Sequence, residues 1–157
     1  MSIILGLNCN HADSSACIIK NGELLFAIEE ERINRIKHWA GLPLSSIEEA
    51  LKYTNIEIEQ ITDISINTNP LSNINQKIIY FLKNYLFGKK KIEIINRLKK
   101  KLDIKNDLKK HFLSKSLNKN LKIHYIDHHL SHIASAFYPS NLNDAVGLSI
   151  DGFGDFA

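Results

Sequence analysis

The sequence predicts an α/β fold built on a mixed β-sheet, and two observations lead to this prediction. First, Asn21-Gly22 separates two apolar runs, and this dipeptide favours the tight turn of a β-hairpin, so the flanking strands are antiparallel. Second, strand-like apolar runs later alternate with amphipathic helical runs, a pattern typical of α/β domains. The 157 residues, 44% of them hydrophobic, suffice for one domain with a core.

The first third of the chain is predicted to contain three strands, a charged segment and a helix. The three strands are expected at residues 3–7, 16–19 and 23–28. The charged segment, residues 29–38, has its acids early and its bases late, which suits the dipole of a helix. Ser45 and Glu48 have the spacing of a capping box, and this spacing predicts a helix that ends near Asn55.

The sequence after the first third predicts two strands on either side of a helical region, then a further helix and a last strand. Amphipathic helices are expected between residues 73 and 121, and a helix that Pro139 closes is expected over residues 130–137. The strands are expected at residues 63–67, 123–126 and 145–150.

Two of the three histidines at the start of the last helix are candidate metal ligands. If Asp127 caps this helix, His128 and His132 lie four residues apart on one face and can bind one metal ion. His129 lies roughly 100° farther around the helix, so a supporting or structural role fits it better. Two histidines at this spacing also occur by chance in ordinary helices, and that alternative stays open.

Asp151 is the candidate third member of this group. It follows the apolar run 145–150 and precedes glycines, which let a backbone approach a metal or phosphate closely. The alternative for Asp151 is a plain glycine turn.

The loop after the first strand contains His11, a candidate general base. It lies at the carboxyl end of a strand, where α/β sheets gather ligands, and histidine accepts protons near neutral pH. A loop histidine without a chemical role is the alternative. Ser14 and Ser15 lack the strand-turn-helix setting of a nucleophile elbow, so we do not expect serine catalysis. Lys37 can hold a phosphate or carbonyl oxygen, or simply belong to the solvated charged run.

The positive charge is confined to one region. Residues 83–122 contain fourteen Lys and Arg and three acids, a balance of +11, and the rest of the chain balances at −8, which together give the net charge of +3. Such a patch can bind nucleic acid. However, apolar residues recur at helical intervals around Lys99, Lys100 and Lys101, so the exposed face of a helix is the favoured interpretation.

The first residues of the chain do not have the pattern of a signal peptide or membrane span. The apolar run at residues 2–7 is short and has no basic leader, which argues against a signal peptide or membrane span. Cys9 and Cys17 form neither a disulfide framework nor a zinc motif. We expect a cytoplasmic protein that does not bind membranes. Because the chain stops directly after a strand-end glycine motif, we expect it to be the amino-terminal part of something longer.

Five runs of residues, taken in order, resemble the carbamoyltransferases of nodulation-factor and antibiotic biosynthesis. They cover about residues 3–55 and 123–157, and five ordered matches are far more specific than any one of them. The runs are Ile4-Leu5-Gly6-Leu7-Asn8, His11 to Ala16, Glu29 to Arg32 with Arg35 to His38, His128 to His132, and Asp151 to Asp155.

This resemblance implies an actin-like ATPase (ribonuclease-H-like) lobe over residues 1–157, with a Lys-rich helical segment at about residues 73–122. Full-length members continue with a second lobe and an adenylate-forming domain, both absent from this chain. That domain joins carbamoyl phosphate and ATP into carbamoyl adenylate, and the actin-like part passes the carbamoyl group to a hydroxyl of a small molecule.

The resemblance also implies roles for single residues. His128, His132 and Asp151 would bind a divalent metal, Fe²⁺, with His128 and Asp151 also facing the substrate. His11 would deprotonate the acceptor hydroxyl, and Lys37 would hold the carbamoyl adenylate. A divalent cation suits this chemistry because it can polarise the carbamoyl carbonyl.

Two departures from the family pattern and two alternative functions remain. Ala12 stands where glycine is often expected, and the absent carboxyl-terminal part should supply a further metal ligand and most nucleotide contacts, so we expect this chain alone to be inactive. A tRNA threonylcarbamoyl transferase of the same fold is one alternative, although His11 with Asp13-Ser14-Ser15 favours the small-molecule family. A non-catalytic basic module that binds nucleic acid is the other.

Overall fold

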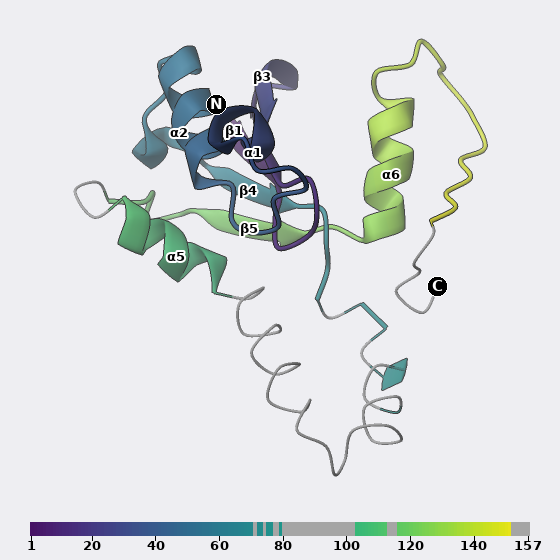
Figure 1. Cartoon of the computed structure of the whole chain (residues 1–157). Coiled ribbons are helices and arrows are strands. Elements are labelled where there is room, and N and C mark those ends of the chain that lie inside the picture. Colours follow the sequence, from purple (N-terminus) through teal and green to yellow (C-terminus); the bar gives the residue numbers. More distant parts are fainter. Residues whose placement is uncertain (71, 74, 77–78, 80–102, 113–115, 152–157) are drawn as a thin grey trace.

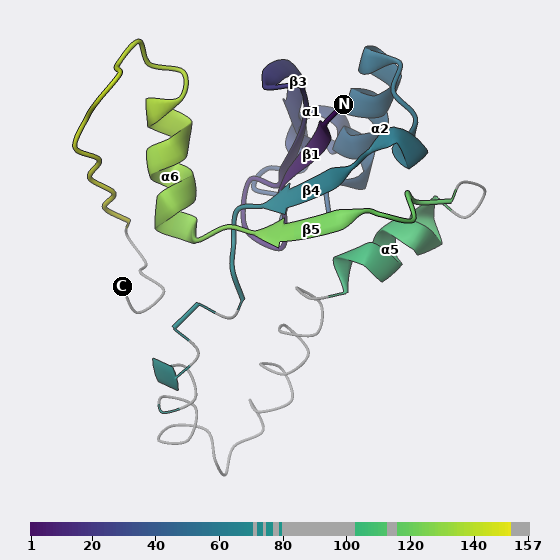
Figure 2. The ribbon, with the colours of Figure 1, turned by 180° about the vertical axis from the view of Figure 1, so that it is seen from behind.

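The computed structural model describes the chain except residues 71, 74, 77–78, 80–102, 113–115 and 152–157. Its centre is one five-stranded sheet with the strand order β3-β2-β1-β4-β5 (Figures 1 and 2). The strands are β1 (Ile3–Asn8), β2 (Ser15–Lys20), β3 (Glu23–Glu29), β4 (Asp63–Ile66) and β5 (Lys122–Tyr125). The five strands therefore lie where the apolar runs predicted them, with ends that differ by one residue.

The directions of the strands confirm the predicted mixed sheet. β2 runs antiparallel to both β1 and β3, whereas β1 pairs in parallel with β4, and β4 with β5. The carboxyl ends of β1, β4 and β5 consequently meet at one edge of the sheet, which is where ligands gather in α/β proteins.

The turn between β2 and β3 has the predicted hairpin geometry. Asn21 and Gly22 have φ angles of 51° and 89°, both in the left-handed region that a primed turn requires. This geometry matches the right-handed twist of the flanking strands, and it fixes β3 as an antiparallel edge strand.

Two helices cover one face of the sheet and enclose the core. The helices whose bounds the structure describes are α1 (Glu30–Asn34), α2 (Leu44–Thr54), α5 (Ile104–His111) and α6 (His128–Phe137), with a 3₁₀ turn at Ile58–Gln60. Side chains from α2 and α5 join those of the strands in a single apolar cluster, which includes Leu5, Ile18, Ile47, Ile64 and Leu108. Each of these five side chains is no more than 1% exposed.

Alternation along β1 assigns its residues to two different faces. Ile3, Leu5 and Leu7 are buried in the core, whereas the residues between them are only partly covered. Those intervening residues, Ile4, Gly6 and Asn8, line a groove on the opposite face of the sheet. One face of the sheet thus stabilises the fold, and the other is open to ligands.

The charged segment forms a shorter helix than predicted. α1 ends at Asn34 because Arg35 adopts a left-handed conformation with φ of 62°. The expected capping box of Ser45 and Glu48 is also wrong, since a Ser45 cap would start the helix at Ser46, whereas α2 begins two residues earlier, at Leu44 after Pro43, with no side-chain cap from its own segment. Instead the carboxylate of Glu30 accepts hydrogen bonds from the backbone amides of Ser45 and Ser46, at 3.2 and 2.7 Å.

The strand predicted over residues 145–150 does not form. The segment is irregular, and Val146, Leu148 and Ile150 are 100%, 81% and 85% exposed. Its apolar pattern suits a strand, but a strand also needs a neighbour that accepts and donates hydrogen bonds. None of the residues that the structure describes offers it one.

Most of the Lys-rich segment lies outside the described residues, and so do Lys99, Lys100 and Lys101. α5 is its longest described part, and there Ile104 and Leu108 are buried while Lys109 and Lys110 are exposed. In the described ranges, no helix combines the length and apolar character that crossing a bilayer requires.

Candidate functional site

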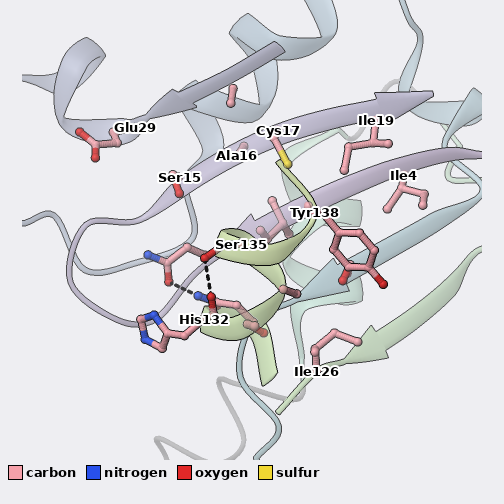
Figure 3. A pocket seen from close by; sticks show the side chains of 18 of the residues that line it. Ile4, Ser15, Ala16, Cys17, Ile19, Glu29, Ile126, His132, Ser135 and Tyr138 are labelled. Carbon is pink, nitrogen blue, oxygen red and sulfur yellow. Dashed lines mark hydrogen bonds between the residues drawn. The ribbon is translucent and has the colours of Figure 1, made fainter. Parts of the chain in front are cut away.

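A groove of about 1110 Å³ separates α6 from the open face of the sheet. Figure 3 shows its walls, with Ser15, Cys17 and Ile19 of β2 on one side and His132, Ser135 and Tyr138 of α6 on the other. Glu29 lies at the end of β3, at the edge where the parallel strands also end. The groove is mostly apolar along the strands, and the polar side chains of the candidate site lie at this edge.

α6 begins at the predicted residue because Asp127 caps it. The Asp127 carboxylate accepts hydrogen bonds from the amides of His129 and Leu130, at 3.1 and 3.4 Å, and from the Ser72 hydroxyl at 3.1 Å. Burial by itself raises the pKa of Asp127, but these hydrogen bonds and the nearby His129 outweigh it and lower the pKa below its usual value. The cap fixes where the helix starts, and with it the direction of the histidines.

His128 and His132 lie on one face of α6, as their spacing predicted, and Asp151 lies beside them. The Nε2 atoms of the two histidines are 3.2 Å apart, and the Asp151 Oδ2 atom lies 2.8 Å from Nε2 of His128 and 4.0 Å from Nε2 of His132. The three candidate ligand atoms all lie within 4.8 Å of one another. Side chains from one helix and from a segment some twenty residues later therefore share one small volume.

The donor set fits a divalent metal ion. Imidazole nitrogen and carboxylate oxygen bind such an ion at about 2.0–2.2 Å, so neighbouring ligand atoms are about 3 Å apart. The two shortest separations in this cluster, 2.8 and 3.2 Å, agree with that value, and the third, between His132 and Asp151, is longer at 4.0 Å. Two histidines and one carboxylate on one side of an ion form the triad typical of non-haem Fe²⁺ sites, which leave positions open for other ligands.

The His11 loop follows β1, and two asparagines hold it. The side-chain amide of Asn8 donates to the carbonyl oxygens of Ala12 and Asp13, at 3.2 and 2.8 Å. Asn67, directly after β4, donates in turn to the Asn8 Oδ1 atom at 3.1 Å. Asparagines at the ends of two neighbouring parallel strands thus fold the loop back over the sheet edge.

His11 faces the metal candidates from this loop. Its ring centroid lies 6.0 Å from that of His128, and its Nδ1 atom is 3.4 Å from the Ala12 carbonyl oxygen. The side chain is exposed, so a ligand can reach it. His11 stands outside the group of three candidate ligands but next to it.

Lys37 lies exposed in the turn after α1, and none of the described contacts joins it to His11 or His128. Its neighbour His38 is anchored: the His38 Nδ1 atom lies 2.8 Å from Asp13 Oδ1, and its backbone amide donates to Glu31 at 3.1 Å. Asp13, Glu31 and His38 form a second cluster whose polar atoms lie within 4.8 Å of one another. This cluster links the Lys37 turn to the His11 loop.

The sequence left several of these supporting residues unnoticed. Ser14 is 1% exposed, and its hydroxyl group donates to the carbonyl oxygens of His11 and Gly41 while accepting from the Gly41 amide. A polar residue between two strands reads as a loop residue, and no local pattern reveals partners 27 positions away. The asparagine at each strand end is the signal that could have identified Asn8 and Asn67.

Fold and site together define an α/β domain with two histidines and one carboxylate clustered at the carboxyl edge of a mixed sheet. The chain belongs to the family described as the carbamoyltransferase N-terminus, whose profile matches residues 3–157. The match covers the sheet, the His11 loop and α6, so it confirms the resemblance that the five sequence runs indicated.

Three curated relatives are similar to this chain over nearly all of its length. The nodulation protein NolNO of Sinorhizobium fredii is 34% identical over 146 residues, which cover 92% of this chain and 20% of that protein. An uncharacterized protein of Synechocystis is 32% identical over 162 residues, covering 100% and 26%. An uncharacterized protein of Methanocaldococcus jannaschii is 30% identical over 153 residues, covering 98% and 23%. The chain thus spans about a quarter or less of the length of these relatives.

Proposed function

We propose that this chain is the amino-terminal part of an O-carbamoyltransferase that passes a carbamoyl group from carbamoyl adenylate to a hydroxyl of a small molecule. Carbamoyl phosphate and ATP would be the source of the adenylate. Membership of the carbamoyltransferase N-terminus family and the similarity to a nodulation protein support this proposal. Because the relatives are four to five times longer, activity is assigned to the longer protein and the chain alone is expected to be inactive.

The observation that carries the proposal is the meeting of His128, His132 and Asp151 beside His11. The three cluster residues would hold Fe²⁺ or a similar cation. When bound, that cation would polarise the carbamoyl carbonyl and stabilise negative charge on its oxygen.

His11 would act as the general base. Its imidazole would take the proton of the acceptor hydroxyl, whose oxygen then bonds to the carbamoyl carbon while the bond from that carbon to the AMP phosphate breaks. AMP leaves with the electron pair of that bond. The exposed ring and its position at the end of β1 support this role.

Lys37 is proposed to bind the adenylate or its carbonyl oxygen, since a flexible ammonium group can reach a phosphate. Its anchored neighbour His38 keeps the turn beside the His11 loop. For the fold, we propose an actin-like lobe, supported by the antiparallel β1-β2-β3 unit that continues through parallel pairing into β4 and β5.

The metal site is tested on the purified 157-residue chain by titration with Co²⁺, whose absorption spectrum reports histidine and carboxylate ligands. We expect one ion per chain, with affinity lost in His132→Ala. The matched control is His111→Ala. His111 lies on α5, outside the cluster, and its Nε2 atom is 2.6 Å from Oε1 of Glu48 on α2. Equal Co²⁺ binding by wild type and His132→Ala would refute the site.

The transfer reaction is tested with a fusion of this chain to the regions of a longer relative that the match does not cover. Carbamoyl phosphate labelled in its carbonyl carbon is supplied with ATP and either small hydroxyl compounds or tRNA. We expect label on a small hydroxyl compound together with AMP, and none of this from the chain alone. Loss of transfer in His11→Ala but not in His111→Ala is the expected pattern, whereas label on tRNA would point to the threonylcarbamoyl class instead.

A further inference from the structure

Residues 145–151 form an extended arm that returns along α6 and brings Asp151 to His128 at the start of that helix (Figure 1). In an extended backbone, alternate side chains point to opposite sides. On one side of the arm, Val146, Leu148 and Ile150 are each at least 81% exposed. The described contacts with α6 come from the other set, the alternate residues Gly147, Ser149 and Asp151.

These three residues contact α6 one after another along the helix. Gly147 lies against Ile133, Ser149 against His129, and Asp151 against His128. As the arm advances, its partners on the helix move back toward the amino end, so arm and helix run antiparallel. The last of the three contacts is the one that brings Asp151 to the metal candidates.

Gly147 allows the arm to approach α6 closely. A Cβ atom at this position would lie 2.7 Å from the Ile133 Cγ2 atom and 3.4 Å from two further Ile133 carbons. The first distance is well inside van der Waals contact, so any larger residue would force the arm or the isoleucine aside. The absence of a side chain therefore sets the distance between arm and helix.

Ser149 provides the polar contact. Its Oγ atom lies 2.9 Å from the Nδ1 atom of His129, and this hydrogen bond is partly buried. The other ring nitrogen of His129, Nε2, is buried and has no hydrogen-bond partner among the described residues. Removing the Ser149 hydroxyl would therefore leave both nitrogens of that ring without a described partner, and an unpaired buried polar group is costly.

We infer that Gly147, Ser149 and His129 are positioning residues that seat the arm on α6 and thereby aim the Asp151 carboxylate at His128 and His132. The inference rests on the proposed metal site, which it extends from three ligands to the contacts that bring the third ligand into place. It accounts for the course of an exposed, apolar arm along the helix without strand pairing.

The first test measures Co²⁺ affinity of the 157-residue chain. Loss of groups that orient a ligand typically weakens metal binding about 10- to 100-fold, and we expect that loss in Gly147→Val, in Ser149→Ala and in His129→Phe. The matched control is Leu148→Ala, a change in the same arm on its exposed side, which should bind within about twofold of wild type. Wild-type affinity in both Gly147→Val and Ser149→Ala would overturn the inference.

The second test needs no metal. In the metal-free wild type, nuclear Overhauser contacts are expected between the Gly147 Hα protons and the Ile133 methyl groups, and the ¹⁵N shift of His128 Nε2 reports its contact with Asp151. Ser149→Ala should weaken those contacts and move the shift toward the value found in Asp151→Ala, whereas Leu148→Ala should change neither.

The two tests separate the inference from the proposed function. If the wild type does not bind Co²⁺ but shows the expected contacts without metal, the metal site is refuted. The packing of the arm against α6 is then still supported. Absence of the contacts between Gly147 and Ile133 in the wild type would refute the proposed packing of the arm against α6, whatever the affinity for metal.

Discussion

The carboxylate of Glu30 accepts a hydrogen bond from the backbone amide of Ser46 over 2.7 Å, so an acidic residue of α1 serves as the cap of α2. Glu30 is 4% exposed, and a second bond comes from the Ser45 amide at 3.2 Å. A buried anion at the amino terminus of a helix satisfies free amides and favours the helix dipole. This contact connects α1, which precedes Lys37 in the chain, with α2, which covers the core.

Replacing Glu30 by Gln is expected to destabilise the protein. The neutral amide keeps the shape but loses the charge-assisted bonds, for which about 1.5–3 kcal/mol is typical. Urea unfolding should show this loss in the free energy of unfolding. Glu23→Gln, an exposed change at the β2-β3 hairpin, is the matched control and should cost less than about 0.5 kcal/mol. Equal stabilities of the two variants would contradict the capping role.

The same contact predicts a dependence of stability on pH. Burial by itself raises the pKa of Glu30, but the hydrogen bonds from Ser46 and Ser45 outweigh it and lower the pKa below its ordinary value of 4.5. The unfolded chain then binds the proton more readily, so the stabilisation is complete above about pH 4.5 and is lost as the pH falls through the lowered value. The free energies of unfolding of wild type and Glu30→Gln should differ most near neutral pH and become equal in acid. A constant difference across this range would argue against the shift.

Asp127→Ala is expected to weaken both α6 and the metal site. Loss of the cap should cost about 0.5–2 kcal/mol, because the amides of His129 and Leu130 lose their acceptor. Since His128 and His132 depend on the first turn of α6, Co²⁺ affinity should fall as well. Asp127→Ser, which retains a cap, should recover most of both losses. Full metal affinity in Asp127→Ala would show that the first turn forms without its cap.

Asn8→Ala should release the His11 loop while leaving the sheet intact. The Asn8 amide group donates to the carbonyl oxygens of both Ala12 and Asp13, at 3.2 and 2.8 Å. Hydrogen exchange over residues 9–14 should therefore speed up, with little change over β4. Asn120→Ala is a suitable control because Asn120 is an exposed asparagine before β5. Unchanged exchange in the loop would mean that its other contacts, such as those of Ser14 and of Asp13 with His38, hold it without Asn8.

The sequence predicted the parts of this molecule whose causes are local. The Asn21-Gly22 turn requires two positive φ angles, and alternation along β1 marks a strand with two different faces. The start of α6 also followed from its own residues, since Asp127 caps the helix and fixes the spacing of His128 and His132. That spacing is the reason why the central pair of the candidate site could be predicted.

The parts that sequence could not predict depend on distant partners. Glu30 looked like one of several exposed acids, and only the fold brings α2 close enough for it to act as a cap. Residues 145–150 have the composition of a strand, but pairing depends on a neighbouring edge, and the arm lies along a helix instead. The arrangement of Ser149 and His129 likewise appears only when segments twenty residues apart meet.

Parallel pairing has a consequence for how the protein reaches this structure. β1 meets β4, and β4 meets β5, only after the chain closes two long loops, since the paired residues Ile4 and Asp63, and then Asp63 and Lys122, are each 59 positions apart. Loops of this length make folding slow compared with that of helical bundles of similar stability. Asn8 and Asn67 become neighbours only when the first of these loops has closed, so the His11 loop should be among the late features to form during refolding.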